Sequence, residues 1–239
     1  MTEVKVAVTI APEQELSQST IDDLIQFQDS IDIIELRIDQ WTNLNEIAIE
    51  KVVEDLQSLK LNKKLLVTYR TSNQGGLGDF GEDDYIQILR KIANCQNIDM
   101  LDIEFDQTRS LNILQELIEL AHKNQVQVVL SHHNFKETPK LEALKHLFYK
   151  MQQLESDYIK VAVMPHGKQD VLNLLNAMSD TADVVSQHVV GIAMSKIGLI
   201  SRTAQGVFGG SISYGCLDTP KAPGQIHVST LKKQLSMYE

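Results

Sequence analysis

The chain is poor in the residues that hold small disulfide-rich or metal-clustered proteins together. Only two cysteines, Cys95 and Cys216, occur among 239 residues, and no C-x-x-C pair is present. This excludes a disulfide framework, a zinc ribbon and a thioredoxin-like redox pair. No stretch approaches the roughly 20 apolar residues of a membrane-spanning helix. With 43% hydrophobic and 23% charged residues, the composition excludes disorder, a collagen-like fibre and a coiled coil.

Basic residues are also scarce, since 22 lysines and arginines face 32 acidic residues and the formal net charge is −10. We therefore expect no nucleic-acid partner and no anionic membrane partner. If the ligand is an anion, local arginines must override the overall field. Residues 1–12 lack a basic segment followed by an apolar one, as a secretory signal would have. Together with the few cysteines, this predicts a cytoplasmic protein.

Short runs rich in Val, Ile and Leu alternate with amphipathic runs along the chain. The expected strands are residues 4–10, 31–39, 64–70, 98–105, 126–132, 158–164, 189–194 and 207–213. The expected helices are residues 20–28, 45–59, 83–93, 111–123, 139–154, 169–178 and 227–237, with Thr138 as N-cap and Pro139 at the first helical position. Strands that alternate with helices form parallel βαβ units. We predict an α/β fold, a single-domain (β/α)8 TIM barrel over residues 1–239, with a doubly wound open sheet as the alternative.

Several expected strands carry polar side chains on one face only. Alternation along each strand groups these side chains towards the carboxyl ends of the strands. They are Glu35 and Arg37, Thr68 and Arg70, Asp102 and Glu104, Ser131 and His133, and Lys160. In a barrel, this parity faces the interior near the mouth where active sites lie. Asp102 and Glu104 also fit an internal salt bridge, whereas the larger set indicates a site.

Lys160 and His133 carry the most distinctive chemistry of this set. Burial and nearby arginines would both favour the neutral amine of Lys160. A neutral amine can attack a carbonyl carbon to form a Schiff base. The alternative is a lysine at a strand edge that buries its aliphatic stem and keeps its ammonium group in water. His133 is either a hydrogen-bonded structural residue or a general acid/base, and the spacing leaves both open.

A G-x-G-x-x-G sequence runs from Gly76 to Gly81. A dinucleotide-binding loop requires its glycines directly at a strand end, opening a helix. Here the expected strand ends at Arg70, and acidic residues at the expected helix start would repel a pyrophosphate. We interpret this segment as a glycine-rich loop and expect no nucleotide cofactor.

Several short motifs occur together, in one order, along nearly the whole chain. They are Glu35-Leu-Arg37-Ile-Asp39, Thr68-Tyr-Arg70, Ser131-His-His133-Asn-Phe135 with Thr138-Pro139, Lys160-Val-Ala-Val-Met-Pro165, Met194 to Arg202, and Ala222-Pro-Gly-Gln225. In these motifs the chain resembles the type I 3-dehydroquinate dehydratases, the Schiff-base enzymes of the shikimate pathway to chorismate and the aromatic amino acids. Two positions depart from the family pattern, since Gln74 stands where some relatives have Glu and Lys221 where relatives commonly have Ser.

The resemblance implies a (β/α)8 barrel, usually a homodimer, that needs no metal and no cofactor and dehydrates 3-dehydroquinate to 3-dehydroshikimate. It implies that Lys160 is the Schiff-base lysine, that His133 is the proton shuttle, and that Glu35 is the carboxylate that orients the histidine. The implied substrate-binding residues are Arg37, Arg70, Arg202 and Gln225.

Two other functions stay open at this point. One is a class I aldolase on a similar barrel, for which Gly198 to Arg202 and Gly209-Gly210 could form a phosphate site. The other is a barrel that binds its ligand without turnover.

Overall fold

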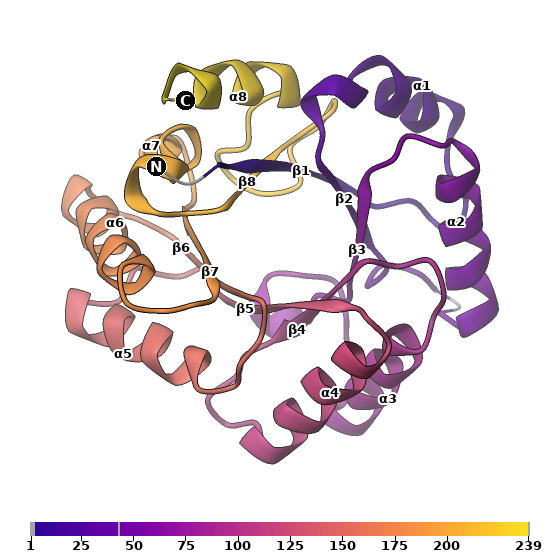
Figure 1. Ribbon diagram of the computed structural model, residues 1–239, viewed down its shortest axis with the longest axis horizontal. Coiled ribbons are helices and arrows are strands. Elements are labelled where there is room, and N and C mark those ends of the chain that lie inside the picture. The colour runs from indigo at the N-terminus through magenta and orange to yellow at the C-terminus, as the bar shows by residue number, and fades with distance from the viewer. Residues whose placement is uncertain (1–2, 43, 239) are drawn as a thin grey trace.

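The computed structural model describes residues 3–42 and 44–238. Its strands follow one another around a barrel, with helices on the outside (Figure 1). The strands are β1 (Lys5–Ile10), β2 (Ile33–Arg37), β3 (Lys64–Thr68), β4 (Met100–Glu104), β5 (Gln127–Asn134), β6 (Tyr158–Val163), β7 (His188–Ala193) and β8 (Ile212–Gly215). The helices are α1 (Gln18–Gln26), α2 (Glu46–Ser58), α3 (Glu82–Ala93), α4 (Leu111–Lys123), α5 (Leu141–Gln152), α6 (Lys168–Ala182), α7 (Leu199–Thr203) and α8 (Val228–Leu235).

The strand order confirms the predicted barrel and excludes the doubly wound sheet. The order is β7-β6-β5-β4-β3-β2-β1-β8, and each neighbouring pair is parallel. A doubly wound sheet has a point at which the strand order reverses. The order observed here has no such point. Between β7 and β8 the ring is closed just ahead of β8, where Val189 bridges to Gly210 and its carbonyl accepts the Ser211 N–H at 2.9 Å.

Aspartates at the amino ends of three strands fix where the neighbouring strands begin. Asp32 accepts the Val6 N–H at 2.8 Å, Asp99 accepts the Leu65 N–H at 2.8 Å, and Asp157 accepts the Val128 N–H at 2.7 Å. Each carboxylate thus pairs with a backbone N–H group that has no partner in the hydrogen bonds between the strands. This end of the barrel is therefore held by charge-assisted hydrogen bonds.

Two apolar layers enclose the sheet. The outer layer lies between the strands and the helices and contains residues such as Leu36, Val67 and Phe148. The inner layer fills the barrel with side chains of opposite parity, including Ala7, Ile33, Leu66, Met100, Val129 and Ile212. Because strand side chains alternate, the polar residues that follow these apolar ones lie on the same inner face, nearer the mouth.

Two element boundaries and one additional helix differ from the sequence prediction. Helix α5 begins at Leu141 with Lys140 as the N-cap residue, so Thr138 and Pro139 do not start it. The Asn134 side chain accepts the N–H groups of Lys136 and Glu137 and holds that segment in a turn instead. Strand β8 starts at Ile212, because residues 205–208 form a 3-10 turn that ends at Gly209 with φ +79°. Helix α7, only five residues long, was not predicted.

Candidate active site

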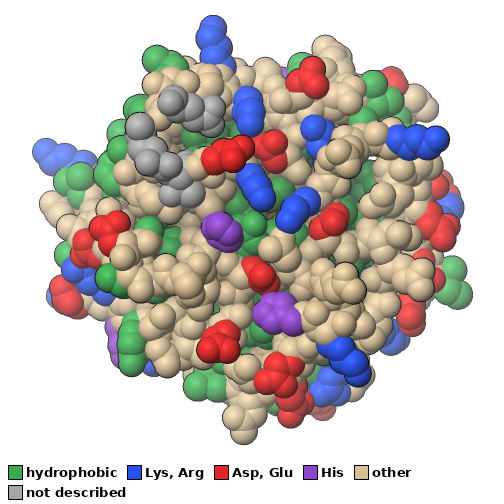
Figure 2. Space-filling model, in the orientation of Figure 1, with side chains coloured by type: hydrophobic (Ala, Val, Ile, Leu, Met, Phe, Trp, Pro, Cys, Tyr) green, Lys and Arg blue, Asp and Glu red, His purple; other side chains and the backbone are tan. Residues whose placement is uncertain are grey.

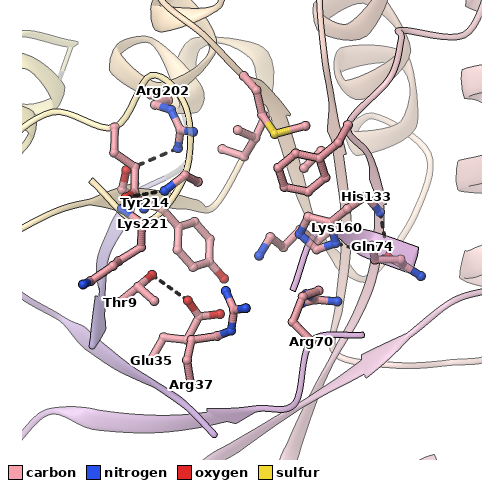
Figure 3. Close-up of a pocket in the computed structure, with 17 residues that line it drawn as sticks. Thr9, Glu35, Arg37, Arg70, Gln74, His133, Lys160, Arg202, Tyr214 and Lys221 are labelled. Atoms are coloured by element: carbon pink, nitrogen blue, oxygen red, sulfur yellow. Dashed lines mark hydrogen bonds between the residues drawn. The ribbon is translucent and has the colours of Figure 1, made fainter. Parts of the chain in front are cut away.

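A pocket opens at the carboxyl ends of the strands, inside the ring of loops (Figure 3). It contains every sequence-predicted site residue. Its lining is Thr9, Glu35, Arg37, Arg70, Gln74, Gly75, His133, Phe135, Lys160, Ala162, Ile192, Met194, Arg202, Tyr214, Lys221, Ala222 and Gln225. Strand register explains part of this convergence, because Arg37 pairs with Thr68, and Ser131 pairs with both Glu104 and Lys160.

Lys160 lies buried in this pocket, with 6% of its surface exposed. Its Nζ atom is 4.0 Å from the centroid of the Tyr214 ring. The pKa of Lys160 is lowered to about 8, chiefly by burial; Arg70 and Arg37 act in the same direction, while Glu35 and Asp102 oppose it. The fraction of neutral amine is therefore substantial at mildly alkaline pH and grows as pH rises through 8.

Glu35 is the negative charge that faces this lysine. Its carboxylate accepts hydrogen bonds from Thr9 Oγ1 at 2.6 Å and from Thr68 Oγ1 at 3.1 Å. Burial would raise the pKa of Glu35, but the charges of Lys160 and Arg37 and the Thr9 hydroxyl outweigh burial and lower it. Glu35 therefore stays ionised and balances the charge on the Lys160 nitrogen.

The side chain that contacts the His133 imidazole through a hydrogen bond is that of Gln74 and not that of Glu35. Gln74 Oε1 accepts the backbone N–H of His133 at 2.8 Å and lies 3.2 Å from His133 Nδ1. Gln74 Nε2 donates to the Phe105 carbonyl at 3.3 Å, which fixes the orientation of the amide. The hydrogen bonds of Glu35 go to threonines, so the implied contact between Glu35 and the histidine is not formed.

This arrangement determines which nitrogen of His133 is basic. Because Gln74 Oε1 can only accept, Nδ1 must carry the proton, and Nε2 is left with the lone pair. Burial and the charges of Arg70 and Lys160 lower the pKa of His133 well below its usual range. His133 is therefore neutral at neutral pH and able to accept a proton at Nε2.

Arg70 joins the inner strands by ion pairs. Its guanidinium lies 2.8 Å from Asp102 and 3.0 Å from Glu104, and it donates to Ser131 Oγ at 2.9 Å. Glu104 also accepts the N–H and the hydroxyl of Thr71 at 2.8 and 2.7 Å. Asp102 and Glu104 thus form the internal salt bridge that the sequence left as an alternative. Most of the charge of Arg70 is balanced before any ligand arrives.

Arg37 is held in a similar way by Asp39 on the same segment. Arg37 Nε and Nη2 donate to the two Asp39 oxygens at 2.6 and 2.8 Å. Asp39 also accepts the Leu77 N–H at 2.9 Å, which ties the glycine-rich loop to the end of β2. Arg37 therefore presents a partly exposed, oriented guanidinium to the pocket.

Arg202 differs from these arginines because it has no acidic partner among the described residues. It is 1% exposed, and its donors reach only the carbonyls of Tyr214 at 3.3 Å and Pro223 at 3.1 Å. Its Nε has no hydrogen-bond partner in the described part of the chain. Burial lowers the pKa of Arg202 to about 10. A buried guanidinium without a counter-charge is suited to a ligand carboxylate.

The loop after β8 covers the pocket beside Arg202. Gln225 Oε1 accepts the N–H groups of Lys221 and Ala222 at 2.7 and 3.1 Å, so Gln225 shapes this loop. Lys221 is exposed and lines the rim. In the space-filling view, several basic side chains lie near one another in the upper half of the face, interspersed with acidic ones (Figure 2).

The glycines after β3 serve close packing. Gly75 has φ +82°, and a Cβ atom there would lie 2.1 Å from the Phe135 ring, while one on Gly76 would lie 2.0 Å from the Arg70 carbonyl oxygen. Helix α3 begins at Glu82 with three acidic residues in its first turn. The absence of side chains at these glycines therefore lets the loop pack closely against the Phe135 ring and the end of β3.

Sequence reasoning missed two pocket residues, Thr9 and Tyr214. Thr9 is the only hydroxyl on the first strand, and its parity matches Ala7, which faces the barrel interior. Tyr214 was missed because the last strand was placed too early. Among the described residues, no group of three or more His, Cys, Asp or Glu side chains could hold a metal ion. No helix in the same residues is long and apolar enough to cross a membrane.

Comparisons with known proteins identify the family of this chain. A family model of the type I 3-dehydroquinases matches residues 6–239. A 3-dehydroquinate dehydratase of Staphylococcus haemolyticus is 50% identical over 100% of this chain and 99% of its own length. One of Staphylococcus carnosus is 52% identical over 100% of this chain and 99% of its own length. A crystal structure of type I 3-dehydroquinate dehydratase from Clostridium difficile, with covalently modified comenic acid, superposes with a TM-score of 0.89 at 30% identity, covering 100% of this chain and 93% of that one.

A barrel with polar groups converging at its mouth defines a (β/α)8-barrel enzyme. The chain belongs to the type I 3-dehydroquinase family and is a carbon–oxygen lyase. This membership favours the dehydratase over the aldolase and over the barrel without turnover.

The Gln74–His133 contact yields a prediction. In Gln74→Glu, a carboxylate would accept the Nδ1 proton and stabilise the imidazolium, so the pKa of His133 should rise. Gln74→Leu offers neither charge nor acceptor, so the pKa should stay low. Histidine-selective isotope labelling and an NMR pH titration measure this directly, with His133→Asn to assign the signal. An unchanged His133 titration in Gln74→Glu would show that Gln74 does not control this ring.

Proposed function

We propose that this enzyme dehydrates 3-dehydroquinate to 3-dehydroshikimate through a Schiff base on Lys160. The observation that carries the proposal is the buried Lys160, with a pKa lowered to about 8, facing Glu35 and close to His133 in one pocket. A neutral amine of this kind adds to a ketone carbon, and loss of water gives an iminium. The family membership supports the substrate.

The iminium is the electron sink of the reaction. Lys160 attacks the C3 ketone of the substrate, and the iminium acidifies the adjacent C2 proton. His133 removes that proton through Nε2, leaving an enamine. The enamine expels the C1 hydroxyl, which leaves as water with the proton that His133 returns. Hydrolysis of the resulting imine releases the product and the Lys160 amine.

The remaining pocket residues bind and position the substrate in this proposal. Arg202 takes the substrate carboxylate, because its guanidinium is buried without an acidic partner among the described residues. Arg37 and Arg70 face the ring hydroxyls from β2 and the end of β3, and Gln225 shapes the covering loop. Glu35 balances the cationic forms of the Lys160 nitrogen. The chemistry proposed uses no metal and no cofactor. A role in the shikimate pathway, a homodimer and a cytoplasmic location remain predictions.

Borohydride trapping tests the Schiff base. Enzyme incubated with 3-dehydroquinate and then reduced should gain covalent mass on the peptide that contains Lys160. Because only the neutral amine attacks, the initial rate of trapping should rise as pH increases through about 8. Lys160→Ala should gain no mass and lose turnover, while the exposed Lys196→Ala should behave as the wild type. Label on Lys196 or Lys221 would assign the nucleophile elsewhere.

His133→Ala separates imine formation from proton transfer. General acid–base catalysis contributes about 10²–10⁴-fold, and His133 serves more than one step, so turnover should fall at least that far. Borohydride should still trap the imine on Lys160 in the folded variant. His132→Ala is the matched control, because the neighbouring side chain points the other way, to the Phe105 carbonyl. Turnover of His133→Ala within a few-fold of wild type would make His133 structural, with His132 and Glu104 the next candidate bases.

Arg202→Lys tests the carboxylate site. The lysine keeps a positive charge but loses the two-pronged geometry of the guanidinium. We expect substrate binding to weaken by about 2–4 kcal/mol, or roughly 30- to 1,000-fold. Calorimetric titration of the substrate onto a Lys160→Ala background measures affinity without turnover. Arg90→Lys, in an exposed pair with Glu116, is the control. Unchanged affinity in Arg202→Lys and Arg202→Ala would remove Arg202 from the site.

A further inference from the structure

The Tyr214 ring lies directly against the reacting nitrogen of Lys160. Tyr214 lies on β8, 4% exposed, and its side chain shares the barrel interior with Ile212 and Ala7. Lys160 Nζ lies over the face of its ring, 4.0 Å from the centroid. Figure 3 shows the ring between Lys160 and the Thr9–Glu35 side of the pocket, with its hydroxyl directed into the pocket.

The hydroxyl of Tyr214 is buried and has no hydrogen-bond partner in the described part of the chain. Buried polar groups in proteins are nearly always hydrogen-bonded. The negative charge of Glu35 and burial keep this phenol protonated, because both raise its pKa well above the ordinary value. An unpartnered donor that faces a substrate pocket indicates that a ligand oxygen completes it.

The face of an aromatic ring attracts a cation and not a neutral amine. The Lys160 nitrogen is positively charged twice in the proposed reaction, first as the resting ammonium and later as the iminium. The ring therefore favours both charged forms at a position where burial disfavours charge. Without the ring, the buried nitrogen would keep only the negative charges of Glu35 and Asp102 as compensation.

We propose that the Tyr214 ring stabilises the positive charge on the Lys160 nitrogen and that its hydroxyl donates a hydrogen bond to an oxygen of the bound substrate. This role rests on the imine chemistry proposed above. It assigns the two ends of one side chain to two separate tasks. The alternative is that Tyr214 only fills the barrel, in which case removing an unpartnered hydroxyl would leave kinetics unchanged.

Two substitutions separate the ring from the hydroxyl. Tyr214→Phe keeps the ring, so the pH at which trapping on Lys160 reaches half its maximum rate should not move. Because the substrate oxygen loses its donor, KM should rise about tenfold, which is in the range of one hydrogen bond. Tyr214→Leu removes the ring as well, so the trapping midpoint should move to lower pH.

The other charged and titratable groups around Lys160 stay constant in this comparison. They come from four neighbouring strands and their ends and are the charged Glu35, Arg37, Arg70 and Asp102 and the titratable His133. A change in the trapping midpoint between Tyr214→Phe and Tyr214→Leu therefore reports the ring. Tyr158→Phe is the matched control, since Tyr158 is also buried inside the barrel but stacks on His188 at the opposite end.

The measurements are the kcat and KM of each variant across pH, the pH profile of borohydride trapping, and thermal unfolding to check folding. Unchanged KM in Tyr214→Phe together with an unchanged trapping midpoint in Tyr214→Leu would overturn the proposal. If Tyr214→Leu does not fold, phenylalanines of increasing ring fluorination at position 214 replace it, and the midpoint should fall with each fluorine. Failure of the wild type to be trapped would instead contradict the Schiff base itself.

Discussion

The pairing of charges inside the barrel governs the rest of the site. Arg70 is neutralised by Asp102 and Glu104, and Arg37 by Asp39, at distances between 2.6 and 3.0 Å. Two buried cations lack such an ion pair among the described residues: Lys160, whose charge is opposed by Glu35 and Asp102 without a salt bridge, and Arg202, which donates to carbonyls alone. Burial lowers the pKa of both. The ion pairs hold the two other arginines in place, and the two cations without an ion pair are able to interact with a ligand.

This division explains how a protein with a net charge of −10 can attract an anionic substrate. Most of its acidic side chains are exposed, whereas Glu35, Asp39, Asp102 and Glu104 are buried beside cations. Inside, charges act at short range in a poorly solvated space, where they are stronger than in water. Local cations therefore decide binding, while the overall charge governs solubility and non-specific partners.

The sequence predicted the barrel and most of its mouth because both depend on local patterns. Alternating apolar and polar residues on β2 and β6 indicate which side chains face inward, and parallel βα units place strand ends together. The partner of His133 could not be found this way, because Gln74 reaches it from a loop after another strand. Tyr214 and α7 were missed for a related reason. The last strand follows a 3-10 turn that ends at a left-handed glycine. The apolar residues of that turn resemble the start of a strand in sequence.

The seam between β7 and β8 gives Arg202 a second significance. There the ring is closed by a bridge at Val189 and Gly210 instead of a ladder of paired strands. Arg202 follows β7 on α7 and donates to carbonyls on β8 and in the loop beyond it. The side chain assigned to the substrate carboxylate thus also fastens the weakest join of the barrel. A ligand carboxylate bound to Arg202 would engage the same side chain that ties α7 to β8, so ligand binding and the stability of this join are linked.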